Sequence, residues 1–521
     1  MLERELKFRI SEEDSPAEIR GALERAGFQL TPSGALFHED RYLDTEDWLL
    51  HRAGLSLRLR REGADLRLEA KTIASGSAVS MERLEWSQQA PENGPPWSHL
   101  PEGEVQALLE PLASLHVVSR LGVRARVASE RETFRWSRHD ETLGSDETLG
   151  SVTLDHVGEG PRSVDGGAER KPYRELELEL REGAPVVLRD VRTALEDSLG
   201  FHPSAETKLS AALDAAGIHV PELDEGPFKP HQSDRLADVA VKNVGRQLGR
   251  MFWYEPGARV GVDPEYVHDM RVATRRLRTA LLVFADVIPD KARREWQREL
   301  RWIGRGLGRV RDCDVERERV MKMAAGAPDP ERSALLIFAN RVEIKRARRR
   351  AKLLQRLDSP RFVALKALAR PWIEMRADQA LVREGDAPAY IAGPRIVAEW
   401  DRRMLEACTI AEQSPTAENV HALRIAIKHT RYAVEYFSDL EGHGAKHRAK
   451  QLGRLQNVLG ARQDAAILLR HMRRYAATIP EEDRELLLGA RSAIEKIDRA
   501  ARVKKSELQQ VLKLGADQDL S

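Results

Sequence analysis

The sequence contains little of what secreted or membrane-spanning proteins need. Of its 521 residues only two are cysteines, Cys313 and Cys408, and 5% are aromatic. Two cysteines cannot build a disulfide framework, and no stretch approaches the ~18 uninterrupted apolar residues of a membrane span. The first residues, MLERELKFRI, carry charges where the core of a secretory signal needs apolar side chains. We therefore expect a soluble protein of a reducing cytoplasm, with at least two domains at ~100–200 residues each.

The formal net charge is also small, at +1, but it hides an uneven distribution. Residues 1–220 hold 27 Lys and Arg against 40 Asp and Glu, and residues 221–521 hold 57 against 43. The first part therefore carries −13 and the second +14. This asymmetry predicts separate domains with different partners, the basic one being suited to a polyanion. Solvated helix faces without any partner remain the alternative on composition alone.

A domain boundary is predicted where the charge changes. Residues 217–233, GIHVPELDEGPFKPHQS, hold three prolines and no hydrophobic periodicity, which is typical of a linker. Before it, segments such as LSLRLR and RELELEL alternate with the period of strands, and after it Arg/Leu/Ala-rich stretches follow helical spacing. We expect an antiparallel β-barrel or tunnel of α+β type at residues 1–217, a linker at 218–232 and an all-α domain at 233–513.

Several predicted strands carry charges on one face. Side chains alternate along a strand, so Glu3, Glu5 and Lys7 share one side. The same alternation groups two arginines and, on a late strand, three glutamates: Arg58 and Arg60, and Glu175, Glu177 and Glu179. A wet outer sheet face explains any single strand. If instead the strands close into a barrel with these faces inward, one cavity holds acidic and basic groups, which suits a polyphosphate with a divalent metal.

The order of the charged residues resembles the CYTH, or triphosphate-tunnel, superfamily. The opening Glu3-x-Glu5-x-Lys7 is similar to the ExExK signature of that family. Further charged positions follow in the family's order over roughly residues 1–215: Arg58, Arg60, Lys71, Arg83, Glu85, Arg131, Arg135, Asp155, Glu175, Glu177 and Lys208. The resemblance implies a closed eight-stranded antiparallel tunnel that hydrolyses or transforms triphosphates with Mg²⁺ or Mn²⁺.

The resemblance also implies roles for these residues. The implied metal ligands are Glu3, Glu5, Asp155 and Glu177, and the implied catalytic set is Glu3, Glu5, Lys7, Glu175 and Glu177. One carboxylate, directly or through a bound metal, would activate water for attack on a terminal phosphorus. The implied triphosphate-binding residues are Lys7, Arg58, Arg60, Lys71, Arg83, Arg131 and Arg135. Glu85 and Lys208 are expected as structural partners, and no Gly-rich phosphate loop or nucleobase signature narrows the substrate.

The second domain contains an internal duplication of about 150 residues. Residues 268–278, HDMRVATRRLR, match residues 421–431, HALRIAIKHTR, without a gap. The match aligns three basic pairs on one helix face: Arg271 with Arg424, Arg275 with Lys428, and Arg278 with Arg431. Lys242 and Arg250 repeat as Arg395 and Arg403, and LGRVRD repeats as LGARQD. We expect repeats at about 233–385 and 386–513.

The duplicated stripe keeps its positive charge where residue identity changes, as at Arg275 and Lys428. Binding of a flexible anion explains this better than specific salt bridges to neighbouring helices, although such pairing remains an alternative. A metal site at His268 and Asp269 is disfavoured, because the second copy has His421 and Ala422.

This pattern resembles the CHAD domain, a helical module often fused to CYTH domains, over residues 232–513. Its most specific parts are the HDMRVATRRLR helix and the segment LGRVRDCDV. The resemblance implies two similar four-helix bundles with a basic groove or pore that binds inorganic polyphosphate. The implied contacts are Lys242, Arg250, Arg271, Arg275, Arg278, Arg403, Arg424, Lys428 and Arg431. The dense basic run KRARRRAK, residues 345–352, is expected on the same groove, since no aromatic residues interleave it for base stacking.

Together the two domains resemble bacterial CYTH-CHAD inorganic triphosphatases. We expect metal-dependent hydrolysis of inorganic triphosphate or polyphosphate in the tunnel, with Mg²⁺ or Mn²⁺ as cofactor and polyphosphate bound by the basic helices. The expected location is the cytoplasm, including association with polyphosphate granules, without a membrane or nucleic-acid partner. The alternatives are a non-catalytic, granule-associated polyphosphate-binding protein and a nucleic-acid-binding protein.

Overall fold

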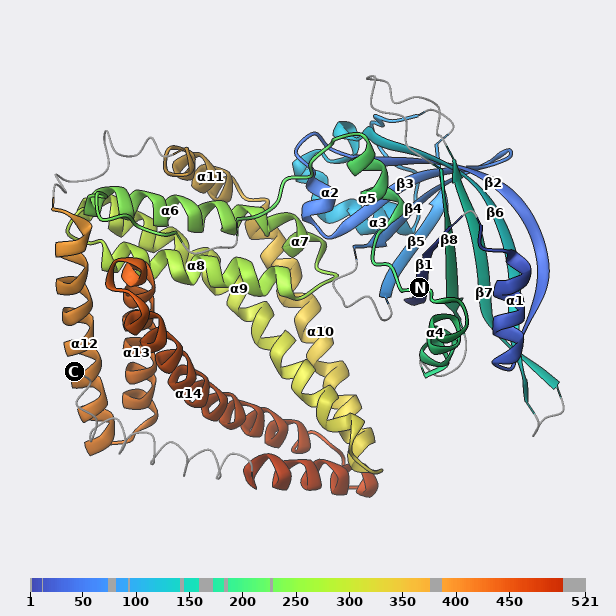
Figure 1. Cartoon of the computed structure of the whole chain (residues 1–521). Helices are drawn as coiled ribbons and strands as arrows, with labels where there is room; N and C mark the ends of the chain where they lie inside the picture. Colours follow the sequence, from blue (N-terminus) through green and yellow to red (C-terminus); the bar gives the residue numbers. More distant parts are fainter. Residues whose placement is uncertain are drawn as a thin grey trace. The chain divides into compact units, whose positions relative to one another are not determined.

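The computed structural model describes residues 2–11, 13–73, 81–91, 94–140, 145–158, 172–181, 186–224, 228–374 and 387–499. The chain forms two compact units, Met1–Glu222 and Leu223–Ser521 (Figure 1). Parts of the second predicted repeat, residues 386 and 500–513, lie outside the described residues, as does the side chain of Glu3. Among the described helices, none has the length and apolar character that crossing a membrane requires.

The first unit is a closed antiparallel barrel of eight strands, which confirms the predicted fold class for this part of the chain. The strands follow one another around the barrel in the order β1, β5, β4, β3, β2, β6, β7 and β8, and β8 pairs again with β1. Their bounds are Leu2–Ile10 (β1), Phe28–Asp44 (β2), Leu55–Glu62 (β3), Asp65–Thr72 (β4), Met81–Gln89 (β5), Gly122–Asp140 (β6), Ser145–Gly158 (β7) and Tyr173–Leu180 (β8). The alternating segments LSLRLR and RELELEL form most of β3 and β8.

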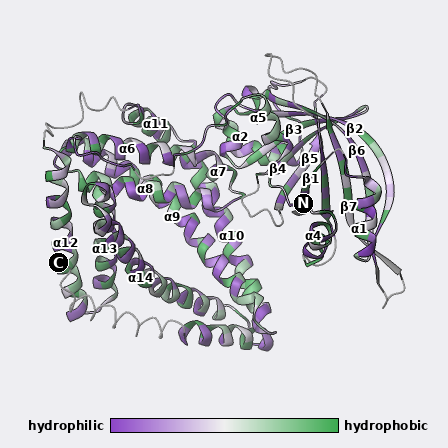
Figure 2. Ribbon diagram, in the orientation of Figure 1, coloured by the Kyte–Doolittle hydropathy of each residue, from purple (hydrophilic) through white to green (hydrophobic). Residues whose placement is uncertain are grey.

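Helices pack against this barrel. Their bounds are Pro16–Arg25 (α1), Leu49–Arg52 (α2), Glu104–Leu109 (α3), Val186–Leu199 (α4) and Lys208–Ala215 (α5), with two 3₁₀ turns at Glu110–Leu115 and Val118–Arg120. Leu6 and Phe8 of β1 pack with Leu23 of α1 and Val191 of α4 in one apolar cluster. The strands therefore turn their apolar faces outward to the helices, and their charged faces inward. Purple and green residues accordingly alternate along the strands in Figure 2.

The second unit is helical and shows the duplication in its helix order. The helices are Leu236–Trp253 (α6), Glu255–Val260 (α7), Glu265–Val283 (α8), Asp290–Ala325 (α9), Glu331–Leu357 (α10), Pro360–Ile373 (α11), Ala389–Gln413 (α12), Ala417–Glu441 (α13) and His443–Ala476 (α14), followed by residues 484–499. The first repeat's α6, α8 and α9 correspond to α12, α13 and α14. In each repeat the middle helix packs against the two others. The predicted all-α duplicated domain is confirmed.

Two apolar cores hold the repeats of this unit together. The larger core joins α6 and α8 of the first repeat to α12 and α13 of the second, for example through Phe284 and Phe437, whose ring centroids lie 5.8 Å apart. The second core joins the C-terminal part of α9 and the start of α10 to the end of α14 and residues 484–499, through Phe338 and Tyr475 among others. Because both cores contain residues of both repeats, the duplicated helices form one unit.

Candidate functional site

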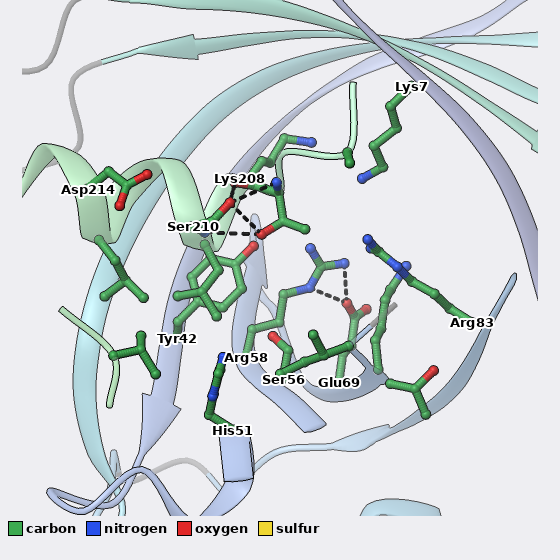
Figure 3. Close-up of a pocket in the computed structure, with 18 of the residues that line it drawn as sticks. Lys7, Tyr42, His51, Ser56, Arg58, Glu69, Arg83, Lys208, Ser210 and Asp214 are labelled. Carbon is green, nitrogen blue, oxygen red and sulfur yellow. Dashed lines mark hydrogen bonds and ion pairs between the residues drawn. The ribbon is translucent and has the colours of Figure 1, made fainter. Parts of the chain in front are cut away.

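The interior of the barrel is a charged cavity of about 730 Å³. Figure 3 shows Lys7, Arg58 and Arg83 pointing toward a common space, with Lys208 and Ser210 of α5 along another side. The further charged residues that line the cavity are Glu69, Lys71, Arg131, Glu177, Asp214 and Glu222. The closed barrel thus places acidic and basic groups in one cavity, as expected if the charged faces of the strands turn inward.

The strand register creates the ion pairs of the cavity. Lys7 lies directly opposite Glu177, Arg58 opposite Glu69, and Arg131 opposite Asp155. Residues directly opposite in an antiparallel pair have their Cβ atoms about 4.5–5.5 Å apart, so their side chains meet. The Lys7 Nζ to Glu177 Oε1 distance is 3.2 Å, and Arg131 donates two hydrogen bonds of 2.7 Å to the Asp155 carboxylate.

Three acidic side chains on β7 and β8 gather at one point. Carboxylate oxygens of Asp155, Glu175 and Glu177 all lie within 4.8 Å of one another, and all three side chains are buried. Two ammonium groups neutralise them: Lys208 Nζ lies 2.6 Å from Asp155 Oδ2 and 3.0 Å from Glu175 Oε1, and Lys7 Nζ contacts Glu177. Burial alone would raise the pKa of Glu177, but Lys7, Lys208 and Arg131 hold it well below its usual range.

Glu5 lies beside this cluster and lacks hydrogen-bond donors. Its side chain is fully buried, and neither carboxylate oxygen accepts a hydrogen bond from the described residues, although Arg83 Nη1 lies 2.9 Å from Oε1. Burial, and then the negative charge of Glu177, raises the pKa of Glu5 to about 8. A buried carboxylate in this state needs a proton or a cation.

These carboxylates fit the divalent metal that the sequence predicts. The donor atoms are all carboxylate oxygens, which hard cations such as Mg²⁺ and Mn²⁺ prefer. The Asp155 carboxylate is already bound by Arg131 and Lys208, whereas the buried Glu5 oxygens accept no hydrogen bond. The candidate ligands are the three clustered carboxylates and Glu5 beside them, and Asp155 is the most tightly held of the four because it accepts three hydrogen bonds from Arg131 and Lys208.

The raised pKa of Glu5 gives a stability prediction for the metal-free protein. Because the folded-state pKa of Glu5 lies above its unfolded value, its contribution to stability is lost as pH rises from about 4.5 to about 8. Glu5→Gln should therefore melt at a higher temperature than the wild type at pH 8 in EDTA, and at nearly the same temperature at pH 4.5. Addition of Mg²⁺ or Mn²⁺ should raise the Tm of the wild type more than that of the variant. Equal metal-induced shifts would contradict a role for Glu5 in metal binding.

Two acidic residues that the sequence analysis missed hold the arginines of β3. Asp40 on β2 lies opposite Arg60, which donates two hydrogen bonds of 2.7 Å to it. Glu69 on β4 accepts a hydrogen bond of 2.8 Å from Arg58 Nε. Glu69 lies two residues before Lys71 and so shares its strand face, which makes Glu69 identifiable from the sequence. Asp40 could be identified only from the strand pairing.

The remaining predicted triphosphate-binding residues differ in position. Lys71 lines the cavity, and its Nζ lies 3.4 Å from Glu85 Oε1, so Glu85 stands as a structural partner. Arg83 also lines the cavity. Arg135 lies on β6 four residues beyond Arg131, is exposed, and is not among the residues that line the cavity.

One wall of the cavity is contributed by α5 and the segment after it. Leu209, Leu213 and Ile218 line the cavity there, and Leu209 packs with Tyr42 of β2. Figure 3 shows Ser210 of α5 next to Tyr42. The cavity lining extends to Glu222, so residues 218–222, within the segment expected as a linker, belong structurally to the first unit. This wall mixes apolar side chains with polar ones such as Ser210, Asp214 and Glu222.

The helical unit contains a second cavity, of about 190 Å³, between the two repeats. The basic residues that line it come from the duplicated helices α8 and α13: Arg271, Arg275, Arg278, Arg424 and Lys428. Small residues let the helices approach, since a Cβ on Gly308 of α9 would lie only 3.3 Å from Arg271 Nε. The internal repeat thus brings two copies of one basic stripe to a common cavity.

The cations of this second cavity are poorly neutralised. Burial, and then repulsion from Arg275, Arg278 and Arg424, lowers the pKa of Lys428 to about 8. Burial and Arg275 likewise lower the pKa of Arg271, although Asp312 acts against them. Within the described residues, no ion pair is formed by Arg271, Arg275 or Lys428, and Arg275 Nε donates instead to Tyr432 Oη at 3.1 Å. Partly buried cations without an ion pair favour an anionic ligand.

The other predicted polyphosphate contacts lie outside this cavity. Lys242 Nζ lies 3.3 Å from Asp234, Arg250 donates to the carbonyl oxygen of Asp224, and Arg403 donates to Glu399. Arg431 lies on α13 but is not among the residues that line the cavity, and its Nε lies 3.6 Å from Glu435 Oε1.

The basic run at residues 345–352 makes mainly structural contacts. Arg346 Nε forms a hydrogen bond with Asp314, and Lys345 Nζ lies 3.6 Å from Glu316. Arg350 donates to the carbonyl oxygens of Arg259 and Val260 at the end of α7. These three residues join α10 to α9 and α7, and none of them lines the cavity between the repeats. The place of this run on a wider polyphosphate groove stays a prediction.

Comparison with known proteins identifies both units. Family models match a CYTH domain at residues 1–212 and a CHAD domain at residues 242–473. The chain therefore contains a CYTH domain followed by a CHAD domain.

Relatives are distant in sequence. The uncharacterized protein MT2285 of Mycobacterium tuberculosis is 25% identical over 485 residues, which cover 90% of this chain and 88% of that protein. The CHAD domain from the plant Ricinus communis is 26% identical, with a TM-score of 0.42, and the match covers 54% of this chain and 96% of that chain. PptA from Streptomyces chartreusis is 18% identical, with a TM-score of 0.41, and covers 53% of this chain and 100% of that chain.

Proposed function

We propose that the CYTH unit hydrolyses inorganic triphosphate with a divalent metal, and that the CHAD unit binds polyphosphate. The observation that carries the hydrolase proposal is the buried acidic cluster of Asp155, Glu175 and Glu177, because Glu177 of this cluster lines the same cavity as Arg58, Arg83 and Arg131. Phosphate release from tripolyphosphate, measured with and without Mg²⁺ or Mn²⁺, tests it, because release without metal would contradict the proposal.

Glu5, Glu175 and Glu177 would hold the divalent cation. When bound, the cation supplies positive charge to phosphate oxygens and lowers the pKa of a coordinated water. Arg131 binds the Asp155 carboxylate through two hydrogen bonds, and Lys208 Nζ lies 2.6 Å from the same carboxylate. The role of Asp155 is therefore to keep these two cations directed at the cluster. Either Mg²⁺ or Mn²⁺ would suit this site, since both ions bind carboxylate oxygens.

The basic residues of the cavity bind and orient the substrate. Arg58 and Arg83 present guanidinium groups to the cavity, and a guanidinium fits two phosphate oxygens at once. Lys71 lies on the same side of the barrel and adds a third cation for the phosphate chain. Although burial would lower it, the pKa of Lys7 is raised by Glu177, Glu175 and Glu5, so Lys7 stays charged and stabilises the charge that develops on the leaving phosphate.

The CHAD unit binds polyphosphate in the cavity between its repeats. The five cavity cations come from α8 and α13. Because Arg275 of one repeat corresponds to Lys428 of the other, the two copies share positive charge but not side-chain shape. Such a site suits a flexible linear anion. Nucleic acid is a poorer fit, since the residues that line this cavity include no aromatic ring for base stacking.

Polyphosphate binding should depend on pH through Lys428. Its pKa of about 8 means that Lys428 is charged at pH 7 and largely neutral at pH 9. The affinity of the wild type should fall up to about tenfold across that range, the equivalent of one charge-assisted hydrogen bond. Lys428→Arg stays charged and should bind equally at both pH values. Fluorescence titration with labelled polyphosphate in EDTA measures this, and parallel pH profiles for the two proteins would contradict the assignment.

A further inference from the structure

The outer face of α10 carries large apolar side chains that remain exposed. Leu336, Ile337 and Ile344 are 39%, 42% and 49% exposed, whereas Phe338 and Val342 on the other side of the helix are buried. α10 runs beside α9 (Figure 1), and the buried side fills a core that the two helices share. Single exposed apolar residues are common in soluble proteins, but several on one helix face mark an interaction surface.

The exposed residues of this face follow the spacing of helices that pair lengthwise. Ile337, Ile344 and Ala351 are seven residues apart, and Asn340 and Ala347 lie three residues after the two isoleucines. Positions alternately three and four residues apart form one continuous stripe along a helix, the pattern of a coiled-coil contact. These five exposed residues, here called the α10 seam, span about 21 Å at 1.5 Å per residue.

Positive charge borders one side of the α10 seam. Arg341, Arg348 and Lys352 lie there at helical spacing, and all three are exposed. Arg341 donates to the Thr478 hydroxyl at 2.7 Å and lies over the Tyr475 ring, contacts that leave its charge in place. Within the described residues, none of the three forms an ion pair with an acidic side chain. This border therefore favours an acidic partner.

The acid on the other side of the α10 seam is already paired. Arg317 Nε lies 3.1 Å from Glu343 Oε2, and Arg346 Nη1 lies 3.4 Å from Glu343 Oε1. This side is otherwise apolar, because Leu336 lies about two turns from Glu343 on α10 and Met321, 38% exposed, lies about one turn from Arg317 on α9. The surface thus has an apolar centre, an apolar side and one basic border.

A second copy of this chain does not match this surface. A two-fold contact through the seam would lay α10 against itself. The helix holds nine Lys and Arg against two Glu, a net charge of +7, so the two copies of α10 would repel each other.

A phosphate chain and a bilayer also match this surface less well than a helix does. A phosphate chain has no apolar group to cover Ile337 and Ile344. A bilayer would take up large apolar side chains such as Trp, Phe or Leu, whereas the seam holds Asn340, Ala347 and Ala351 beside the two isoleucines. The small alanine side chains instead let another helix approach closely.

We propose that the α10 seam docks an amphipathic helix of a partner protein, which packs apolar residues at heptad spacing against Ile337 and Ile344 and presents Asp or Glu to Arg341, Arg348 and Lys352. The heptad spacing selects a helix, and the basic border selects its charge. Asn340 within the seam favours one register of the two helices. This inference goes beyond the proposed hydrolysis and polyphosphate binding and depends on neither.

The test uses the full chain and a fluorescent synthetic peptide of four heptads, with Leu at its two seam positions and Glu at the positions that flank them. Repulsion among the Glu residues keeps this peptide from pairing with itself. A second peptide has Lys in place of the flanking Glu. Fluorescence anisotropy in EDTA at about 0.15 M salt measures the affinity of each peptide.

Two variants remove the two halves of the proposed contact. Ile337→Ser/Ile344→Ser removes the apolar centre, and Arg348→Glu/Lys352→Glu reverses the basic border. The matched control is Val363→Ser/Leu488→Ser, which removes two apolar side chains, 62% and 60% exposed, that lie outside α10. Because the replaced side chains are exposed, every variant should keep the Tm of the wild type.

We expect the Glu peptide to bind the wild type with a Kd of about 1–100 µM, since contact along one helix is smaller than a standard interface. The Lys peptide should bind at least about tenfold more weakly, and each α10 variant should lose at least about tenfold in affinity for the Glu peptide. The control, and the cavity variant Arg275→Glu/Lys428→Glu, should match the wild type, because neither changes α10.

Absence of binding by the Glu peptide, or equal binding by the wild type and both α10 variants, would overturn the proposal. Loss of binding in the cavity variant would overturn it too, because the peptide would then occupy the cavity between the repeats. A bilayer is the occupant instead if vesicles with anionic lipid bind the wild type and not the isoleucine variant. A second copy is the occupant if sedimentation shows a dimer that this variant abolishes.

Discussion

Glu177→Gln is expected to lower the rate of phosphate release from tripolyphosphate by at least about 100-fold, the size of effect found when one group that stabilises a transition state is removed. Glu177 contacts Lys7 at 3.2 Å and Arg131 at 3.3 Å and belongs to the acidic cluster with Asp155 and Glu175. Replacement by Gln keeps the shape but removes a negative charge and a metal-binding oxygen. The loss should appear mainly in kcat, measured at saturating metal and substrate.

Glu179→Gln is the matched control for this variant. Glu179 lies two residues further along β8, on the same strand face, and its Oε2 accepts a hydrogen bond of 3.0 Å from Ser151. Its oxygens are not part of the acidic cluster. The control should keep activity within about twofold of the wild type, as expected of a group that makes no transition-state contact. Wild-type activity in Glu177→Gln, with an unchanged Tm, would show that the cluster is not the catalytic centre.

Arg275→Glu/Lys428→Glu should weaken polyphosphate binding by at least about 100-fold, because each position loses a charge-assisted contact of about 1.5–3 kcal/mol. Both residues line the cavity between the repeats, one from each copy of the basic helix. Hydrolysis of tripolyphosphate should be unchanged, since none of the residues that line the barrel cavity belongs to the helical unit. Retention of labelled long-chain polyphosphate and phosphate release, measured on the same preparation, give both values.

The control for charge reversal is Arg484→Glu/Arg491→Glu, at two exposed positions outside the cavity. If this pair weakens binding as much as the cavity pair, binding reflects net charge alone and not a site. If the cavity pair also abolishes hydrolysis, the two units do not divide binding and catalysis as proposed.

The main features of the fold follow from periodicity. Alternation in LSLRLR and RELELEL predicts strands, and these residues form β3 and β8. The match between residues 268–278 and 421–431 predicts equivalent helices, and both lie in α8 and α13 at corresponding positions. Periodicity succeeds here because each element buries one face along its whole length.

The site was only partly predictable, because strand pairing decides which charges meet. Arg60 is visible in the sequence as a cation on a strand face, but its partner Asp40 is set by the register between β2 and β3. Alternation also leaves undecided whether a charged face turns to solvent or into a barrel, and the helices packed on Leu6 and Phe8 decide this. The wall formed by α5 and residues 218–222 has no local sequence signal.

Prediction from the internal repeat is limited in a similar way. The repeat predicts Lys242, Arg250 and Arg403 as phosphate contacts because their positive sign recurs. Their contacts with Asp234, the Asp224 carbonyl group and Glu399 depend on loops and helix turns that the repeat does not align.

The central claim is that the barrel is a metal-dependent inorganic triphosphatase. The most direct measurement is phosphate release by the full chain from tripolyphosphate, long-chain polyphosphate, ATP and thiamine triphosphate, each with Mg²⁺, with Mn²⁺ and with EDTA. The account predicts rapid release from tripolyphosphate with Mg²⁺ or Mn²⁺ and none in EDTA. Release that persists in EDTA, or no release from tripolyphosphate with either metal, would contradict it.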